Sequence, residues 1–319
     1  MDLVALAKNP APSGATTGIL KSPGGMRLRF ARWEATRGPR RGTVCVFHGR
    51  GEFIEKYFEV VADLRRRGFT VATLDWRGQG GSERMLYNSR KGHVRSFADY
   101  DRDLAAFMTE IVLPDCQPPF IALAHSMGGH ILLRHAVAAY SWFERMVLSA
   151  PMVAIHPSQL GYRPPVPRIY AETMCALGLG RLYAPGGSDD ALEAEEFEDN
   201  TLTSDPERYA RNMMVVEAAP RLGVGSPTIR WLRSALRSIA RLTAPDYPSQ
   251  VKVPLLLFAA GMDRVVSTTH IEDLALRLKV GAHVLIPQSR HEILQETDEV
   301  RKDFWAAFDA YLGVDAPAA

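Results

Sequence analysis

The stretch ALAHSMGGHI, residues 122–131, is the most informative part of the chain because it joins an apolar run to a helical pattern through a serine. The run FIALAH (120–125) has the composition of a buried strand, and MGGHILLRHAVAAY (127–140) has the spacing of a helix. Ser126 is therefore expected on a sharp strand-to-helix turn. The open question is whether Ser126 is an activated nucleophile or only a small residue at a strand end.

On both sides of this stretch, apolar β-rich runs alternate with helix-period segments. Such alternation predicts a mostly parallel central sheet flanked by helices. The central runs are apolar throughout, as expected for strands covered on both faces. We expect strands at 26–35, 43–49, 69–76, 120–125, 145–150, 254–260 and 282–287, and helices at 55–68, 96–112, 127–140, 269–280 and 300–313.

Two segments depart from this alternation and set the expected domain organisation. Residues 1–24 are rich in Pro, Gly, Ser and Thr, which predicts a flexible N-terminal arm. Residues 151–250 contain many prolines and short helix-like segments, which predicts a helical cap inserted between two strands. The core would then consist of residues 25–150 and 251–319.

Composition limits the class of protein. With 319 residues, 46% hydrophobic and 23% charged, the chain fits a soluble globular protein, and a net charge of +2 indicates no nucleic-acid partner. Three cysteines without paired spacing favour a reducing compartment. The N-terminal stretch lacks a secretory pattern, and no run approaches the ~20 apolar residues of a membrane span. We therefore expect a cytoplasmic protein whose membrane contact, if any, is peripheral.

Two further polar residues follow late strands, where ligand sites of α/β sheets lie. Asp263 follows PLLLFAAGM, and His291 follows AHVLIPQSR. The chain order Ser126, Asp263, His291 is that of the α/β-hydrolase triad. A serine hydroxyl needs a base to take its proton, histidine titrates near neutral pH, and a carboxylate orients the imidazole. These three residues are the candidate catalytic set.

A tetrahedral oxyanion also needs backbone donors. One is expected from the N–H of Met127, at the start of the helix after the serine. The other is expected from the loop HGRGE (48–52), with the N–H of Arg50 as the donor. Losing one such donor typically costs ~3 kcal/mol of barrier.

The turn around the serine departs from the G-x-S-x-G pattern at its first position, where this chain has Ala124. Alanine is still small enough for the strand and helix to pass closely. Gly128 and Gly129 are expected to allow close helix–strand packing. The motif alone is weak, but its place between a strand and a helix strengthens it.

Several motifs together resemble the monoacylglycerol lipase and bacterial lysophospholipase branch of the α/β-hydrolase superfamily, which includes sequences labelled serine aminopeptidases. The core motifs are HGRGE (48–52), DWRGQGGS (75–82), AHSMGG (124–129), VLSAP (147–151) and GMDRVV (261–266). In the cap, NTLTSDPERYARN (200–212) and PTIRWLRSAL (227–236) are most similar to the lysophospholipase L2 type. The resemblance covers about residues 25–312.

The resemblance implies an α/β-hydrolase fold with an inserted helical cap. It implies Ser126 as nucleophile, Asp263 as orienting acid and His291 as base, with an oxyanion hole from Arg50 and Met127. It also implies a lipid-like acyl ester as the small-molecule substrate and no cofactor. DWRGQGGS fits neither a Walker motif nor a dinucleotide fingerprint, so we expect a tight strand–loop junction beside the active site.

Alternative interpretations stay open at this point. Ser126 could be a structural turn in a non-catalytic binding protein of the same fold, and Asp263 could cap the helix that begins near Thr268. The enzyme could also be a general carboxylesterase, or a peptidase acting on an N-terminal residue. A peptidase would need an acidic cluster near the substrate amine, and the sequence does not place the cap carboxylates there.

The other histidines are expected to have supporting roles. His48 should hold the oxyanion loop through hydrogen bonds, His125 should be structural, and His93 should make a polar loop contact. His130 and His135 are expected to pack on, or lie at the surface of, the helix after the serine. None of the histidines forms a metal-spaced cluster, so no metal is expected.

The cap segment 228–243 places Arg230, Arg233, Arg237 and Arg241 on one helical face beside apolar residues. Such a stripe could meet anionic head groups at a lipid–water interface. The simpler interpretation, which we favour, is a cap helix with a solvated basic face. The acidic run at 189–200 could pair with these arginines or stay solvated. The sequence does not indicate an oligomeric state.

Overall fold

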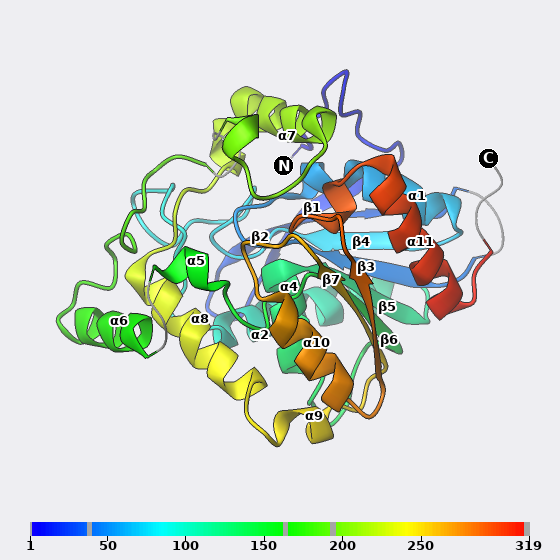
Figure 1. The fold of residues 1–319 in the computed structure, drawn as a ribbon. Helices are drawn as coiled ribbons and strands as arrows, with labels where there is room; N and C mark the ends of the chain where they lie inside the picture. The colour runs from blue at the N-terminus through cyan, green and yellow to red at the C-terminus, as the bar shows by residue number, and fades with distance from the viewer. Residues whose placement is uncertain (1, 37–39, 162–164, 192–195, 316–319) are drawn as a thin grey trace.

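One eight-stranded sheet organises the chain in the computed structural model, which describes residues 2–36, 40–161, 165–191 and 196–315. The strand order is β1-β2-β4-β3-β5-β6-β7-β8 (Figure 1). Strands β3 to β8 pair in parallel, whereas β1 and β2 are antiparallel to their neighbours. The strands are β1 (Thr16–Lys21), β2 (Arg27–Trp33), β3 (Thr43–Phe47), β4 (Thr70–Leu74), β5 (Phe120–His125), β6 (Arg145–Ser149), β7 (Leu255–Ala260) and β8 (Gly281–Ile286).

Helices cover both faces of this sheet, as the sequence predicts. Figure 1 shows α1 and α11 on one side and α2 and α4 on the other. Arg67 binds Asp309 at 2.7 Å on the first side. The residues of β3, β4 and β7 are all buried, which explains their continuous apolar composition. The helices are α1 (Phe58–Arg66), α2 (Ala98–Phe107), α3 (Leu113–Asp115), α4 (Ser126–His135), α10 (Thr268–Arg277) and α11 (Asp298–Leu312).

The predicted elements are confirmed, with differences at their ends. The helix expected at 55–68 begins as a 3-10 turn, η1 (Ile54–Tyr57), before α1. The helix expected at 96–112 is α2 followed by a π-helical turn, η2 (Met108–Val112). The helix after the serine ends at His135 rather than at residue 140.

The prediction of a flexible arm over residues 1–24 is wrong at residues 16–21. These residues form β1, which pairs antiparallel with β2 from Thr16↔Arg32 to Lys21↔Arg27. A tight turn joins the two strands, and Gly24 and Gly25 adopt φ of 91° and 84° there. A Gly-Gly turn lets an edge strand form a hairpin, so backbone hydrogen bonds order the segment.

Residues before β1 are also held against the core. The Val4 N–H donates to Glu55 Oε1 at 3.1 Å, and the Asn9 side chain donates to the Glu55 carbonyl at 2.9 Å. Val4 and Leu6 pack against a small apolar cluster that contains Phe53. These contacts attach the N-terminal segment to the turn that follows the oxyanion loop.

Between β6 and β7, the described residues form helices where the cap is predicted. Asp205 caps α7 by accepting from the N–H groups of Glu207 and Arg208, and Thr228 caps α8. Treating 151–250 as a domain separate from the core stays a prediction. The elements are α5 (Pro157–Leu160), α6 (Val166–Ala176), η4 (Phe197–Asp199), α7 (Pro206–Ala218), η5 (Pro220–Leu222), α8 (Ile229–Leu242) and α9 (Tyr247–Gln250).

The arginine stripe of α8 is partly neutralised within the cap. Arg233 Nε lies 2.6 Å from Glu172 Oε2 on α6, and Arg237 Nη2 lies 2.7 Å from the same oxygen. The acidic run at 189–200 is not the partner in these pairs. Within that run, Asp189 accepts a hydrogen bond from Asn88 at 2.9 Å, and residues 192–195 lie outside the described residues.

Cys45, Cys116 and Cys175 are each buried and unbridged in the structure. Among the helices of the described residues, none combines the length and apolar character needed to cross a bilayer.

Candidate active site

Ser126 lies on a strained turn between β5 and α4. Its φ is 51°, a left-handed conformation that costs energy for a residue with a side chain. The helix start lies very close to the neighbouring strand. A Cβ on Gly128 would lie 2.5 Å from the Phe47 carbonyl oxygen, and one on Gly129 would lie 2.8 Å from Pro151 Cβ. This confirms that the two glycines permit the close helix–strand packing expected from the sequence.

The structure brings the three candidate catalytic side chains together. Ser126 follows β5, Asp263 follows β7 and His291 follows β8, and all three are buried. His291 Nε2 lies 2.9 Å from Ser126 Oγ, and His291 Nδ1 lies 2.7 Å from Asp263 Oδ2. This is the geometry of a nucleophile, a base and an orienting carboxylate.

Asp263 does not cap the following helix, which was the alternative interpretation of this residue. Its Oδ1 accepts from the N–H groups of Val265 at 2.7 Å and Val266 at 2.9 Å, whereas α10 has Ser267 as its N-cap residue. These bonds fix the carboxylate so that Oδ2 faces His291. The interpretation of Asp263 as a helix cap is therefore wrong.

The charges and hydrogen bonds around Asp263, above all those of His291, favour the ionised form of this carboxyl. Burial alone would raise the pKa of this carboxyl, but the charge and hydrogen bond of His291 and the two backbone donors lower it below its ordinary value. Since Asp263 is ionised, His291 Nδ1 carries the proton that lies between them. His291 Nε2 then presents its lone pair to the Ser126 hydroxyl.

Burial lowers the pKa of His291, but three carboxylates outweigh that effect and leave the pKa above its ordinary value. Asp263 contributes most, and Glu292 and Glu52 add to it. The imidazolium formed during the reaction is thus stabilised by surrounding negative charge.

Activity should therefore rise with pH through an inflection above ~6.5, the ordinary histidine value, because only neutral His291 can accept the serine proton. Nearby histidines do not account for such an inflection, since burial lowers the pKa of His125 to about 3 and of His93 to about 4. Measuring kcat/KM from about pH 5 to 9 tests this. A flat profile, or an inflection well below 6.5, would contradict it.

The oxyanion loop HGRGE passes directly beside the nucleophile. A Cβ on Gly49 would lie 3.2 Å from Ser126 Cβ. His48 holds the loop as predicted, because its Nδ1 bonds the Gly49 carbonyl at 2.7 Å and its Nε2 accepts from Trp76 N–H at 3.2 Å. The backbone N–H groups of Arg50 and Met127 stay the predicted oxyanion donors.

The sequence indicated no particular role for the side chain of Arg50, but the structure places it against the cap. Its Nη1 donates to the Gly225 carbonyl at 3.0 Å, and its guanidinium lies 5.9 Å from the ring centre of Trp231 on α8. The oxyanion loop and the cap are therefore in direct contact through one side chain.

The remaining histidines have contacts consistent with supporting roles. His125 Nδ1 bonds the Ser149 carbonyl at 3.1 Å, and its ring packs 4.7 Å from the ring of His291. His93 bonds the Thr228 hydroxyl at 3.0 Å. His130 bonds the Met152 carbonyl at 2.7 Å, and His135 stacks on Trp142.

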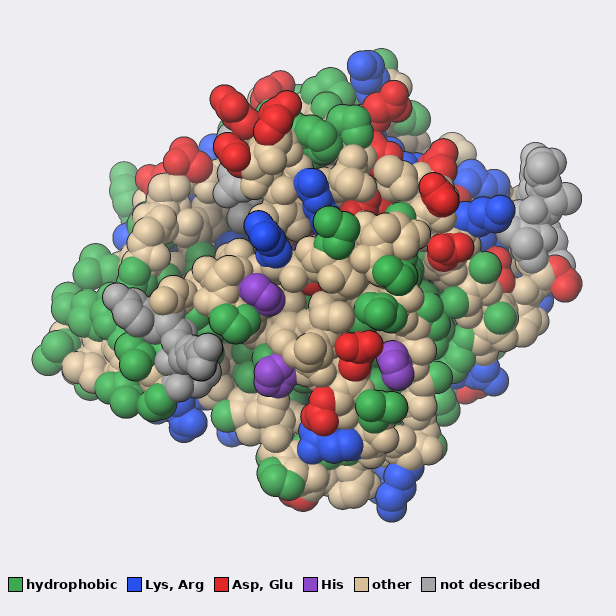
Figure 2. All heavy atoms as spheres, viewed as in Figure 1, with side chains coloured by type: hydrophobic (Ala, Val, Ile, Leu, Met, Phe, Trp, Pro, Cys, Tyr) green, Lys and Arg blue, Asp and Glu red, His purple; other side chains and the backbone are tan. Residues whose placement is uncertain are grey.

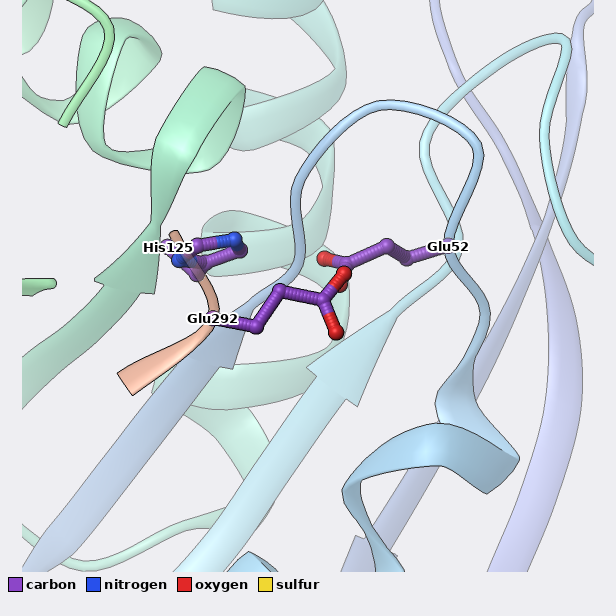
Figure 3. Close-up of side chains that lie close together, drawn as sticks. All are labelled: Glu52, His125 and Glu292. Atoms are coloured by element: carbon purple, nitrogen blue, oxygen red, sulfur yellow. The ribbon is translucent and has the colours of Figure 1, made fainter. Parts of the chain in front are cut away.

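A buried polar cluster lies under the oxyanion loop and was not predicted from the sequence. Glu52, His125 and Glu292 offer ligand-type atoms within 4.8 Å of one another (Figure 3). Lys56 supplies the positive charge there, since its Nζ lies 2.6 Å from Glu292 Oε1 and 3.1 Å from Glu52 Oε1. Burial opposes ionisation of Glu52, but Lys56 and the neighbouring histidines lower its pKa below the ordinary value. The cluster is thus arranged as a buried ion pair, and the expectation of no metal stays a prediction.

Comparison with known families agrees with this fold and geometry. The family described as "Serine aminopeptidase, S33" matches residues 38–298 of the chain. The chain belongs to this family. The match extends over strands β3 to β8 and over the cap segment.

Named relatives of this S33 family member include lipid hydrolases. Lysophospholipase L2 of Escherichia coli (strain K12) is 33% identical over 291 residues, which cover 86% of this chain and 80% of the relative. Monoacylglycerol lipase of Mycolicibacterium smegmatis is 27% identical and covers 86% of this chain and 90% of its own length.

A solved structure supports the fold assignment. The structure of a soluble variant of monoglyceride lipase from Saccharomyces cerevisiae, in complex with a substrate analog, has a TM-score of 0.75. It covers 95% of this chain and 97% of its own, at 21% identity. The α/β-hydrolase fold predicted from the sequence is confirmed.

Proposed function

We propose that this chain is a serine hydrolase that cleaves carboxylic esters of single-chain lipids through an acyl-enzyme on Ser126. The observation that carries this proposal is the continuous relay from Asp263 through His291 to Ser126, with 2.7 Å and 2.9 Å between the bonded atoms. Family membership and the names of the relatives support an ester hydrolase that acts on lipids.

The relay supports the following acylation step. Ser126 Oγ attacks the ester carbonyl carbon while its proton passes to His291 Nε2. The carbonyl oxygen becomes an oxyanion, which the N–H groups of Arg50 and Met127 stabilise. When the carbon–oxygen bond to the alcohol breaks, His291 returns the proton to the leaving alkoxide. The acyl group then remains on Ser126.

Deacylation uses the same groups in reverse. A water molecule donates a proton to His291 Nε2 and attacks the acyl carbonyl. The second oxyanion collapses, the Ser126 oxygen leaves and takes the proton back from His291, and a carboxylic acid is released. Asp263 stays ionised and stabilises the imidazolium in both steps.

Exposed apolar residues of the cap support contact with a lipid surface. Figure 2 shows hydrophobic side chains gathered over α6 at the left of the molecule. A patch of this kind, near basic residues, is typical of sites that meet a membrane or lipid interface peripherally. The exposed side chains are Val166, Ile169, Leu177, Leu179 and Leu182.

The alternative functions of the same fold have less support. A peptidase would need carboxylates that can bind a substrate amine. Besides Asp263, the carboxylates that act on His291 are Glu292 and Glu52, and both already bind the Lys56 ammonium. A non-catalytic binding protein would have no need for an aligned relay. A general carboxylesterase shares the relay and differs only in substrate.

A substrate panel tests the proposal. We expect the highest kcat/KM with a lysophospholipid or a monoacylglycerol, lower values with short-chain nitrophenyl esters, and no turnover of aminoacyl amides. The chemical step is shared, so the ranking reflects binding of the acyl chain and head group. Preference for short esters would favour the carboxylesterase alternative, and turnover of aminoacyl amides would favour the peptidase. Failure to hydrolyse any ester would contradict the proposal.

A further inference from the structure

We propose that Gln79 is a positioning residue of the oxyanion hole. Its side chain holds the loop that carries Arg50 and the helix start that carries Met127 in a fixed relative position. The inference rests on the proposed function, because it assumes that these two backbone groups bind an oxyanion. Gln79 lies in the motif DWRGQGGS, whose role the catalytic relay leaves unexplained.

The side chain of Gln79 contacts both halves of the predicted hole. Its Oε1 accepts from the Gly51 N–H at 2.5 Å, and its Nε2 lies 3.8 Å from Met127 Sδ as a donor. Both Gln79 and Met127 are buried. A single carboxamide thus bridges the oxyanion loop and the first turn of α4.

The bond to Gly51 has a counterpart on the other side of Arg50. The Gly49 N–H donates to the carboxylate of Glu52, so side chains hold the amides on both sides of the Arg50 amide. These bonds fix the peptide planes before and after the plane that carries the Arg50 N–H. The direction of that N–H is therefore set before substrate binds, which is what electrostatic preorganisation requires.

The loop that carries Gln79 is itself rigidly supported. It bends around Asp75, whose carboxylate accepts from Gly81 N–H at 2.7 Å and from Arg29 Nε at 2.6 Å. A Cβ on Gly80, which has a φ of 50°, would overlap the Asp75 carboxylate, and one on Gly81 would lie 2.5 Å from Arg29 Nε.

Further contacts tie this support to the oxyanion side of the molecule. The other oxygen of Asp75 accepts from Ile54 N–H at 2.9 Å, and Arg29 also binds Glu55 at 2.7 Å. Ile54 and Glu55 follow HGRGE (48–52) in the sequence, with only Phe53 between. The buried ion cluster of Asp75, Arg29 and Glu55 thus anchors both the loop of Gln79 and the segment that follows the oxyanion loop. Glycines in DWRGQGGS leave the space that this cluster occupies.

Replacing Gln79 by methionine tests the inference, because methionine keeps the length but accepts no comparable hydrogen bond from Gly51. We expect kcat to fall about tenfold, less than the loss of an oxyanion donor, with KM changed by about twofold at most. The affinity for a boronic acid analogue of the tetrahedral intermediate should fall by the same factor as kcat/KM. Rates are to be normalised to active sites titrated with a fluorophosphonate.

Gln295→Met is the matched control. Gln295 is an equally buried amide that donates to the Lys56 carbonyl at 3.0 Å but does not bond the oxyanion loop. We expect this control to change the melting temperature without a comparable fall in kcat per titrated site. If Gln79 had only a structural role, Gln79→Met and Gln295→Met would show similar changes in both melting temperature and kcat per titrated site.

Gln79→Glu provides a second, nearly isosteric test that does not depend on the methionine variant folding. Its carboxyl keeps an acceptor for Gly51 but adds a negative charge beside the developing oxyanion when ionised. The ratio of variant to wild-type kcat should therefore rise as pH falls and the carboxyl becomes neutral. A ratio independent of pH would contradict the inference.

The outcomes separate this inference from the proposed function. If the wild-type chain reacts with the fluorophosphonate and hydrolyses esters, but Gln79→Met retains kcat and analogue affinity, the inference on Gln79 alone is overturned. If the wild-type chain neither reacts nor hydrolyses esters, the proposed function fails and the inference fails with it.

Discussion

Replacing Ser126 by alanine should abolish ester hydrolysis, with a fall in kcat of about 10⁶-fold. The oxygen that forms the acyl bond is lost, and His291 is left without the hydroxyl that lies 2.9 Å from its Nε2. The variant should fold, because alanine tolerates this backbone conformation elsewhere in the chain. Ala150 adopts a φ of 43°, close to the 51° of Ser126. Steady-state hydrolysis of a lysophospholipid or monoacylglycerol is the measurement.

Ser149→Ala is the matched control for this substitution. Ser149 is a buried serine at the end of β6, next to β5, and its hydroxyl is buried without a hydrogen-bond partner. Its removal should leave kcat nearly unchanged. Retention of more than about 1% of wild-type activity by Ser126→Ala would rule out Ser126 as the nucleophile.

Replacing Asp263 by asparagine should lower kcat by about 10⁴-fold. The carboxamide oxygen can still accept from Val265 and Val266, so the loop should keep its shape. Its NH₂ group, however, would face His291 Nδ1 as a donor and favour the tautomer with the proton on Nε2. That tautomer cannot take the proton of Ser126.

The pH dependence of Asp263→Asn provides an independent readout. Asp263 makes the largest contribution that raises the pKa of His291, so its neutral replacement should shift the activity inflection to lower pH. Residual activity should be measured over the same pH range as for the wild type. A loss of less than about tenfold, with an unmoved inflection, would show that Asp263 does not orient the base.

The convergence of the candidate site could be predicted because strand ends meet at one edge of a parallel sheet. Ser126, Asp263 and His291 each follow a strand that sequence patterns identify, and the chain order fixes their roles. The close helix–strand packing at Gly128 and Gly129 could also be predicted from local rules, because a strand-to-helix turn of this kind leaves no space for Cβ atoms there.

Other features could not be predicted because they depend on contacts far apart in the sequence. Gln79 meets Gly51 and Met127 only after two loops and a helix start have packed together. The pairing of Lys56 with Glu292 spans 236 residues, and no local pattern indicates it.

Strand β1, in contrast, could have been predicted, because the local sequence has the pattern of a β-hairpin. A short β-prone run, Thr16–Lys21, is followed by a Gly-Gly turn and by β2, which is the pattern of a hairpin. The Pro, Gly and Ser content of the surrounding residues favoured a flexible arm instead. The hydrogen bonds of an edge strand outweighed that compositional tendency.

The most direct test of the central claim is to locate the covalent adduct that forms when the wild-type chain reacts with a fluorophosphonate. After proteolysis, mass spectrometry should find one phosphonylated peptide, with the modification on Ser126. An unmodified chain, or an adduct at another residue while Ser126 stays unmodified, would contradict the assignment of Ser126 as the nucleophile that His291 activates.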